Sequence, residues 1–211
     1  GAEVAGATLE ITAENVLDTT KLELSRTDKN GNKTVLVKGT DYSISTDGKT
    51  IQFVSGEDAT IITGLPAGSY QLKETNAPDG YGYAEEISFT VEKSGKITVN
   101  GEDVNGQVVM KDDVTKVSIS KKDITGDNEI PGATLQIKDK NGDVVEEWTS
   151  TDKPHEINGK LTAGKEYTLH EENAPNGYAY SEDVKFTVDE TGKVTEVTMK
   201  DDVTKGSISK K

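Results

Sequence analysis

One repeated segment constrains the fold of this chain more than any other feature of its sequence. Val114–Lys122 returns with a single change as Val203–Lys211, which is 89 residues later (203 − 114 = 89). Met110–Asp113 returns unchanged as Met199–Asp202 at the same spacing. Segments that recur at a fixed period belong to copies of one structural unit. We therefore expect tandem copies of a small domain instead of one large core.

Two more matching pairs place the copies along the chain. Gly6–Leu9 matches Gly132–Leu135, and Glu74–Tyr81 matches Glu171–Tyr178. Because all the matches keep their order, a domain border is expected near Asp113.

The alignment of the copies divides the chain into three pieces. Residues 114–202 make a complete domain, and residues 203–211 are the first strand of a third repeat. The first domain is residues 1–113. Its first residue aligns with the interior of the complete copy and not with its beginning, so this domain is expected to lack its first strand. It also carries extra strand-like stretches around residues 15–63.

Short runs of alternating apolar and polar residues recur in both copies, and such runs are typical of strands that bury one face. In the second copy these runs are Val117–Lys121, Leu135–Ile137, Val144–Trp148, Tyr167–Glu171, Val184–Val188 and Val197–Asp201. In the first copy they are Tyr70–Glu74, Ile87–Val91 and Val108–Asp112. With frequent turns and no long helical pattern, the predicted fold class is all-β, with two tandem immunoglobulin-like β-sandwich domains.

The composition argues against several functions. The net charge is −14, and phosphate binding needs a basic surface, so no nucleic-acid partner is expected. There is no cysteine, so disulfides cannot hold such small domains together. No apolar run is long enough to cross a membrane, and the two histidines, His155 and His170, do not provide a zinc-ligand set. We therefore expect no metal or cofactor, and no membrane segment in this fragment.

Three ionisable residues of the second copy lie on the apolar face of predicted strands. Lys121 continues the row of Val117 and Ile119, Glu171 ends the Tyr167–Glu171 run, and Asp201 ends the Val197–Asp201 run. Burying an isolated charge is expensive, so such groups neutralise or pair. Three of them suggest that they meet in the core. One lysine at a strand end could instead extend to solvent, and composition by itself favours that simpler interpretation.

A meeting of these groups predicts a specific reaction. An apolar core favours the uncharged amine and the protonated carboxyl group. A neutral Lys121 amine is a nucleophile, and a protonated Glu171 could polarise the Asp201 carboxyl group and carry protons. Attack on the Asp201 carboxyl carbon with loss of water would give an amide, an isopeptide bond between two side chains. Glu171 would be its catalytic residue.

Four segments together resemble a known family. They are Ser120–Asp123, Ile130–Leu135, Tyr167–Glu171 and Ala174–Tyr178. In these residues the chain resembles the Cna B-type domain (SpaA-like, with a prealbumin fold) of Gram-positive surface adhesins and pilins. The resemblance implies that Lys121 is the reactive lysine, Glu171 the catalytic glutamate and Asp201 the acceptor. It also implies an extracellular, cell-surface location in a parent protein anchored to the cell wall.

The first copy has only part of this set. Glu74 and Asp112 occupy the matching places, but no lysine does, since Lys21, Lys33 and Lys38 lie in the wrong strands. Lys210, in the third-repeat segment, is the equivalent lysine. Residues 203–211 could therefore add as a strand to the first domain of another copy, with a bond from Lys210 to Asp112. The alternative is an unpaired chain end with no such role.

The resulting functional hypothesis is a non-enzymatic stalk or spacer module, whose only chemistry is its own bond formation. Its expected partners are neighbouring repeats of the same protein, and another copy through residues 203–211. An alternative is a host-ligand-binding adhesin domain, in which the stretch at 15–63 binds a matrix protein or a glycan. Strand donation that gives intermolecular assembly is a second alternative.

Overall fold

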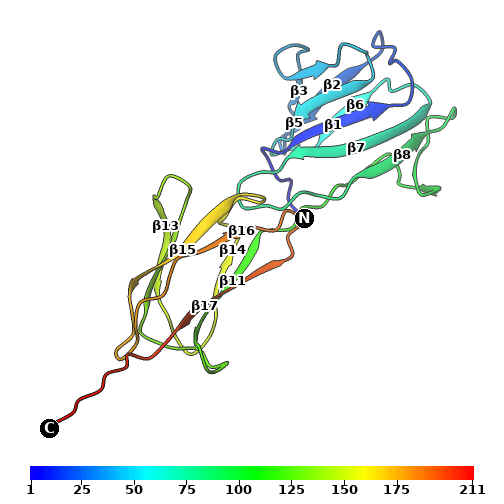
Figure 1. The fold of residues 1–211 in the computed structure, drawn as a ribbon. Helices are drawn as coiled ribbons and strands as arrows, with labels where there is room; N and C mark the ends of the chain where they lie inside the picture. The colour runs from blue at the N-terminus through cyan, green and yellow to red at the C-terminus, as the bar shows by residue number, and fades with distance from the viewer. The chain divides into compact units, whose positions relative to one another are not determined.

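The computed structural model describes residues 1–211, and all its regular elements are β-strands, as Figure 1 shows. The predicted all-β class is confirmed. The chain divides into two compact units. Unit 1 consists of Gly1–Pro78 and Gly82–Asp113, and unit 2 consists of Asp79–Tyr81 and Val114–Lys211. No helix of the chain is long and apolar enough to cross a membrane.

Unit 2 is a sandwich of two sheets. Its strands are β11 (Lys116–Asp123), β12 (Thr134–Lys138), β13 (Val144–Thr149), β14 (His155–Asn158), β15 (Glu166–Asn173), β16 (Val184–Thr187) and β17 (Val194–Asp201). One sheet has the order β14-β11-β17, and the other has the order β13-β12-β15-β16. The first strand β11 and the last strand β17 are parallel neighbours, whereas all other pairs in this unit are antiparallel. The two ends of the domain sequence are therefore joined by one ladder.

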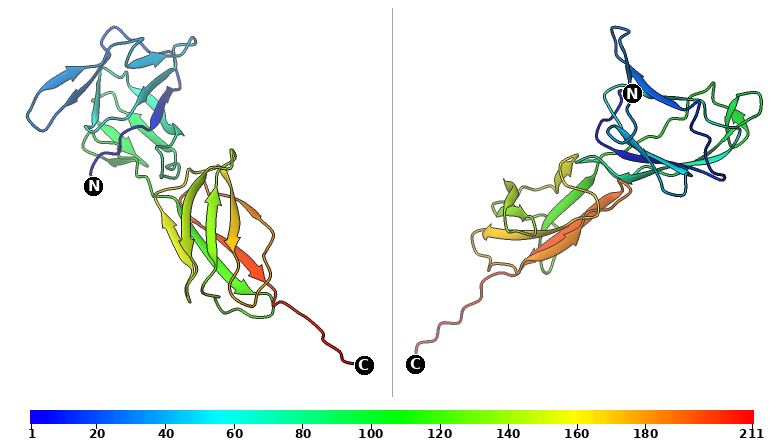
Figure 2. Two further views of the ribbon diagram at one scale, coloured as in Figure 1. Left: turned by 90° about the vertical axis from the view of Figure 1, so that its left-hand side faces the viewer. Right: turned by 90° about the horizontal axis from the view of Figure 1, so that it is seen from above.

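The core of unit 2 lies between these two sheets. Inward-facing residues alternate along β11, β15 and β17, which is the period of two that the sequence predicts. The fully buried members include Val117, Leu135, Leu169 and Met199. Figure 2 shows the strands of unit 2 from two further sides, with the extended segment 203–211 leaving at the end of β17.

Unit 1 has a larger and less regular set of strands. They are β1 (Thr8–Ala13), β2 (Glu23–Thr27), β3 (Lys33–Val35), β4 (Tyr42–Ile44), β5 (Thr50–Val54), β6 (Thr60–Thr63), β7 (Gly68–Asn76), β8 (Ile87–Val91), β9 (Ile97–Val99) and β10 (Glu102–Asp103). One sheet has the order β10-β9-β8-β7-β1-β5-β4, and the other has the order β3-β2-β6. Strand β6 therefore pairs with β2 on one side, and its other edge carries no strand.

The predicted strand at Val108–Asp112 is wrong, because this segment of unit 1 has no regular structure. The matching residues of unit 2 form β17, and their ladder partner there is β11. Residues 105–112 pair with no strand of unit 1. Val108 and Met110 still rest, half-buried, against the core of unit 1. The segment has the side-chain pattern of a strand but lacks a backbone partner.

This difference predicts a contrast in amide hydrogen exchange. The amides of Val197 and Met199 belong to the β11–β17 ladder, whereas those of Val108 and Met110 have no ladder. In the full chain at low concentration, exchange followed by NMR should be orders of magnitude faster at Val108 and Met110, because only β17 must break ladder hydrogen bonds to open. Equal protection at the two pairs would contradict the unpaired edge of unit 1.

Candidate functional site

Three buried ionisable side chains meet in unit 2, and each comes from a different strand. Lys121 lies near the end of β11, Asp201 is the last residue of β17, and Glu171 lies on β15 in the opposite sheet. Their exposed fractions are 1% for Lys121, 3% for Glu171 and 1% for Asp201. The inward position of each follows from alternation along its strand, and the parallel register sets Lys121 opposite Met199. Asp201, two residues further on, faces the same way.

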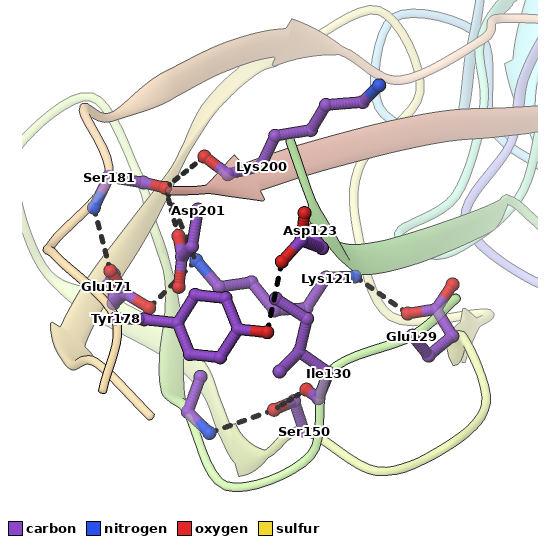
Figure 3. A network of polar contacts seen from close by, with 11 residues as sticks. Lys121, Asp123, Glu129, Ile130, Ser150, Glu171, Tyr178, Ser181, Lys200 and Asp201 are labelled. Atoms are coloured by element: carbon purple, nitrogen blue, oxygen red, sulfur yellow. Dashed lines mark hydrogen bonds and ion pairs between the residues drawn. The ribbon is translucent and has the colours of Figure 1, made fainter. Parts of the chain in front are cut away.

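The side-chain atoms of this cluster are in direct contact, as Figure 3 shows. The Lys121 Nζ atom lies 2.8 Å from Glu171 Oε1 and forms a still closer ion pair with Asp201 Oδ1. Asp201 Oδ2 is buried and has no hydrogen-bond partner. One amine therefore faces two carboxyl groups in a site closed to solvent.

Ser181 completes the cluster, and sequence reasoning missed it. Its backbone N–H donates to Glu171 Oε2 at 2.8 Å. Its hydroxyl group contacts Asp201 Oδ1, lies 2.6 Å from the Lys200 carbonyl oxygen, and is 3.4 Å from Lys121 Nζ. Ser181 lies in an irregular loop between β15 and β16, where no strand period indicates which side chains point inward. The sequence did contain one usable signal for Ser181: it follows three residues after Tyr178, which is the last residue of the Glu171–Tyr178 motif.

Two contacts hold the end of β11 around this cluster. Glu129 Oε2 accepts a hydrogen bond of 2.8 Å from the Lys121 backbone N–H. The Tyr178 hydroxyl group donates to Asp123 Oδ2 at 3.0 Å, and this bond to the carboxylate raises the pKa of Tyr178 above its usual value. Both contacts are drawn in Figure 3. They fix the direction of the strand that carries the amine.

The arrangement is suited to chemistry more than to stability. One buried ammonium group cannot neutralise two carboxylates. The cost of removing an ion pair from water also often cancels the attraction between its two charges. Transfer of the amine proton to a carboxyl group relieves the charge and leaves a nucleophile beside an acid. Groups held in permanent contact avoid the entropy loss of a bimolecular encounter. The geometry can therefore support condensation of Lys121 with Asp201.

Unit 1 contains the two carboxyl groups of this arrangement without an amine. Glu74, on β7, is 4% exposed, and its Oε2 atom accepts a 2.7 Å hydrogen bond from the Ala84 N–H. Its Oε1 atom is buried and has no hydrogen-bond partner. Burial raises the pKa of Glu74, and repulsion from Asp112 adds to this effect while the Ala84 bond opposes it. Burial also raises the pKa of Asp112.

The other residues that the sequence singled out lie at the surface. Lys210 is exposed in segment 203–211, outside any strand, and Lys21, Lys33 and Lys38 are exposed as well. Lys33 forms an ion pair with Glu23. His155 stacks on Trp148, with the ring centroids 4.3 Å apart. No group of three or more metal-binding side chains occurs in the chain.

Comparison with known proteins establishes the family. The model of the SpaA prealbumin-like fold domain matches the chain twice, at residues 1–105 and 115–203. The chain belongs to this family of prealbumin-like fold domains, and the expected resemblance is confirmed. No curated protein matches the chain.

Several solved structures are similar to the chain at low identity. The group B streptococcus pilus 2b backbone protein is 16% identical, with 94% of this chain and 86% of that chain covered and a TM-score of 0.38. The shaft pilin SpaA from Lactobacillus rhamnosus GG is 15% identical, with 98% and 90% covered and a TM-score of 0.39. A C-terminal fragment of the pilus adhesin SpaC from the same organism is 15% identical, with 90% of each chain covered and a TM-score of 0.40.

The raised pKa of Glu74 predicts how stability depends on pH. A carboxyl group whose folded pKa exceeds its unfolded value stabilises the fold below the unfolded pKa, and this contribution is lost as pH rises through the folded pKa. Glu74→Gln should therefore stabilise unit 1 at neutral pH, and the gain should shrink toward zero as pH falls below the ordinary glutamate pKa of about 4.3. Amide exchange of Leu72 and Phe89, buried in unit 1, measures the effect.

Glu85→Gln, at an exposed site for which no such gain is expected, is the matched control. A Glu74→Gln variant that is less stable than the wild type at neutral pH would contradict the assignment of Glu74 as an uncompensated buried acid.

Proposed function

We propose that the chain is a load-bearing stalk segment of a bacterial surface protein, and that unit 2 is locked by an amide bond between Lys121 and Asp201. The observation that carries the proposal is the buried contact of the Lys121 amine with Glu171 and Asp201, where the first and last strands meet. Membership in the SpaA prealbumin-like fold family agrees with this role. In this proposal residues 1–113 and 114–202 are successive copies of one stalk domain.

The bond-forming step conserves atoms and protons. Lys121 first gives a proton to the Asp201 carboxylate, and its neutral amine attacks the Asp201 carboxyl carbon. Glu171, as a carboxylic acid, protonates the departing oxygen and takes a proton from the attacking nitrogen. The new C–N bond replaces a C–O bond, one water leaves, and Glu171 ends unchanged. Asp201 Oδ2 suits the leaving oxygen because it has no hydrogen-bond partner, whereas Ser181 holds Oδ1.

The position of this bond suits mechanical load. Force that enters at Val114 and leaves at Asp202 runs along β11 to Lys121, crosses to Asp201 and leaves the unit. Residues 122–200 then lie outside the load path and cannot be pulled out. Closing a loop of this size also constrains the unfolded chain, by about 4 kcal/mol in the entropy model. In a chain without cysteine, the bond takes the place that a disulfide has in other small extracellular domains.

Binding of a host ligand receives less support from unit 1. One open cavity of unit 1, of about 490 Å³, is lined by residues of β1, β7, β8 and β9 and by the turn that follows β9. The extra stretch at residues 15–63, where a ligand site was expected, contributes nothing to this lining, and it lines a second, much smaller hollow of about 30 Å³ only with Asn15, Val16 and Leu17. No observation therefore favours a ligand over the structural role.

The first test of the bond is the intact mass of the purified chain. The wild type should be lighter than its sequence mass by one water, whereas Lys121→Ala should show no deficit. Asp201→Asn is more diagnostic, because an asparagine acceptor loses ammonia. Its bonded product should have the same mass as the bonded wild type. The half-exposed neighbour Lys122 provides the control, since Lys122→Ala should keep the deficit.

The proposal fails if the wild type has its full sequence mass after prolonged incubation. It also fails if the deficit survives Lys121→Ala and tandem mass spectrometry places the bond elsewhere in unit 2.

The second test measures the mechanical role by single-molecule pulling on the chain. Bonded unit 2 should not lengthen, because residues 122–200 stay outside the load path. Glu171→Gln keeps the shape of the side chain but removes the acid, so it should trap the unbonded state. Its unfolding should then release about 25 nm of chain for the 79 residues between the two side chains (200 − 122 + 1 = 79).

Glu172→Gln, at the exposed neighbouring position, should behave like the wild type. Full extension of unit 2 in a wild-type molecule whose mass shows the bond would contradict the load path proposed here.

A further inference from the structure

The Ser181 hydroxyl group of unit 2 has two acceptors for a single proton. Its oxygen lies 2.6 Å from the Lys200 carbonyl oxygen and also contacts Asp201 Oδ1, as Figure 3 shows. A carbonyl oxygen cannot donate, so the bond to Lys200 uses the hydroxyl proton. A hydroxyl proton turns to whichever acceptor suits it. The same proton is therefore also available to the Asp201 carboxyl group.

The edge of β17 fixes the position of this hydroxyl group. Successive carbonyl groups of a strand point to opposite edges, and the Asp201 carbonyl oxygen accepts a bond from the residue that follows β11. The Lys200 and Asp202 carbonyl groups point to the other edge, where Asp202 accepts a 2.9 Å bond from the Ala179 N–H. Residues 179–181 thus run along the edge of β17 that β11 does not occupy. This loop places Ser181 beside Asp201.

Unit 1 has the same loop contact without a hydroxyl group. Ala84 occupies the place of Ser181 in the repeat. The Ala84 N–H donates to Glu74 Oε2 at 2.7 Å. The equivalent bond from the Ser181 N–H to Glu171 Oε2 is 2.8 Å long. The loop therefore reaches the buried glutamate without help from a hydroxyl group, and the Ser181 hydroxyl group is free for another role.

The two oxygen atoms of the Asp201 carboxyl group have unequal surroundings. Oδ1 contacts the Lys121 amine and the Ser181 hydroxyl group, whereas the buried Oδ2 has no hydrogen-bond partner. Attack of an amine on the carboxyl carbon places negative charge on one oxygen. Such charge is costly in a buried site unless a donor faces it. Oδ1 has a donor that is not itself a reacting group, and this donor is Ser181.

We propose that Ser181 is a catalytic residue of amide formation, whose hydroxyl group donates a hydrogen bond to Asp201 Oδ1 as the tetrahedral intermediate forms. The inference rests on the bond proposed above between Lys121 and Asp201. Before attack, the hydroxyl proton bonds to the Lys200 carbonyl oxygen, and it turns to Oδ1 when negative charge develops there. A donor that bonds more strongly in the transition state than in the ground state accelerates the step.

The step conserves atoms and electrons and leaves Ser181 unchanged. The neutral Lys121 amine forms a C–N bond to the carbon of the protonated Asp201 carboxyl group, and the carbonyl electron pair moves onto Oδ1. When this pair returns, the bond between the carbon and Oδ2 breaks. Oδ2 leaves as water with its own proton and with one that Glu171 transfers from the nitrogen. The Ser181 hydroxyl group then returns to the Lys200 carbonyl oxygen.

The test measures the rate of bond formation in the full chain. The chain is made by cell-free synthesis, translation is stopped, and samples are quenched in denaturant at increasing times. Intact mass then gives the fraction that has lost one water. Ser181→Val and Ser181→Thr add the same branched shape, but only threonine keeps the hydroxyl group. Ser181→Val should form the bond about a hundredfold more slowly than Ser181→Thr, the effect of losing one donor to a developing charge.

Two controls separate catalysis from folding. Tyr180→Phe removes a hydroxyl group from the neighbouring position, where the side chain is 64% exposed, and it should match the wild type. A short protease pulse on the same samples measures how fast unit 2 folds. Folding should be equally fast in Ser181→Val and Ser181→Thr, because the loop of unit 1 makes its backbone contact with alanine in this place.

The Asp201→Asn variant supplies a second measurement. An asparagine acceptor loses ammonia but passes through the same charged oxygen. Adding Ser181→Val to Asp201→Asn should therefore slow the loss of ammonia by at least the same factor, since the amide also loses the donor that orients its oxygen. An unchanged rate of ammonia loss would contradict the role of Ser181.

Two further outcomes would overturn the inference while the proposed bond stands. One is a Ser181→Val chain that forms the bond as fast as Ser181→Thr. The other is slow bond formation that is matched by equally slow folding, because Ser181 would then serve the fold alone. A wild type that never loses water overturns the proposed function and this inference together. The mass of the wild type therefore distinguishes the two failures.

Discussion

The parallel pairing of β11 with β17 is the interaction on which the rest of this structure depends. It joins the first and last strands of unit 2 in one ladder and sets Lys121 and Asp201 on the same inward face. Glu171 reaches the pair from the opposite sheet. Because this ladder closes the domain on itself, one bond at its end can hold the whole unit. The mechanical and chemical proposals therefore share a single structural cause.

Unit 1 shows what happens where this ladder is absent. The residues Val108–Asp112 have nearly the same sequence as the end of β17, yet they form no strand. Strand propensity depends strongly on context, since most of it reflects packing and pairing with neighbours. The two carboxyl groups of unit 1 remain in place without a counter-charge. The comparison separates the pattern of side chains, which both units have, from the backbone partner, which only unit 2 has.

The buried cluster could be predicted in part. A period of two selects Lys121, Glu171 and Asp201 as inward-facing residues, because each continues an apolar row. Ser181 could not be found in this way, since it lies in a loop whose direction depends on packing between β15 and β17. The strand predicted at Val108–Asp112 failed for the opposite reason: its pattern was correct, but a strand needs a neighbour that the local sequence does not reveal.

The sequence by itself determined the tandem copies, the all-β class and the residues that face inward, because repeats and alternation are local properties of the chain. Only the tertiary structure decided which strands pair and in which direction. It joined β11 to β17, left the matching edge of unit 1 open and placed the Ser181 hydroxyl group beside Asp201. Those outcomes depend on contacts between residues far apart in the chain, and no local pattern encodes the partner of a strand.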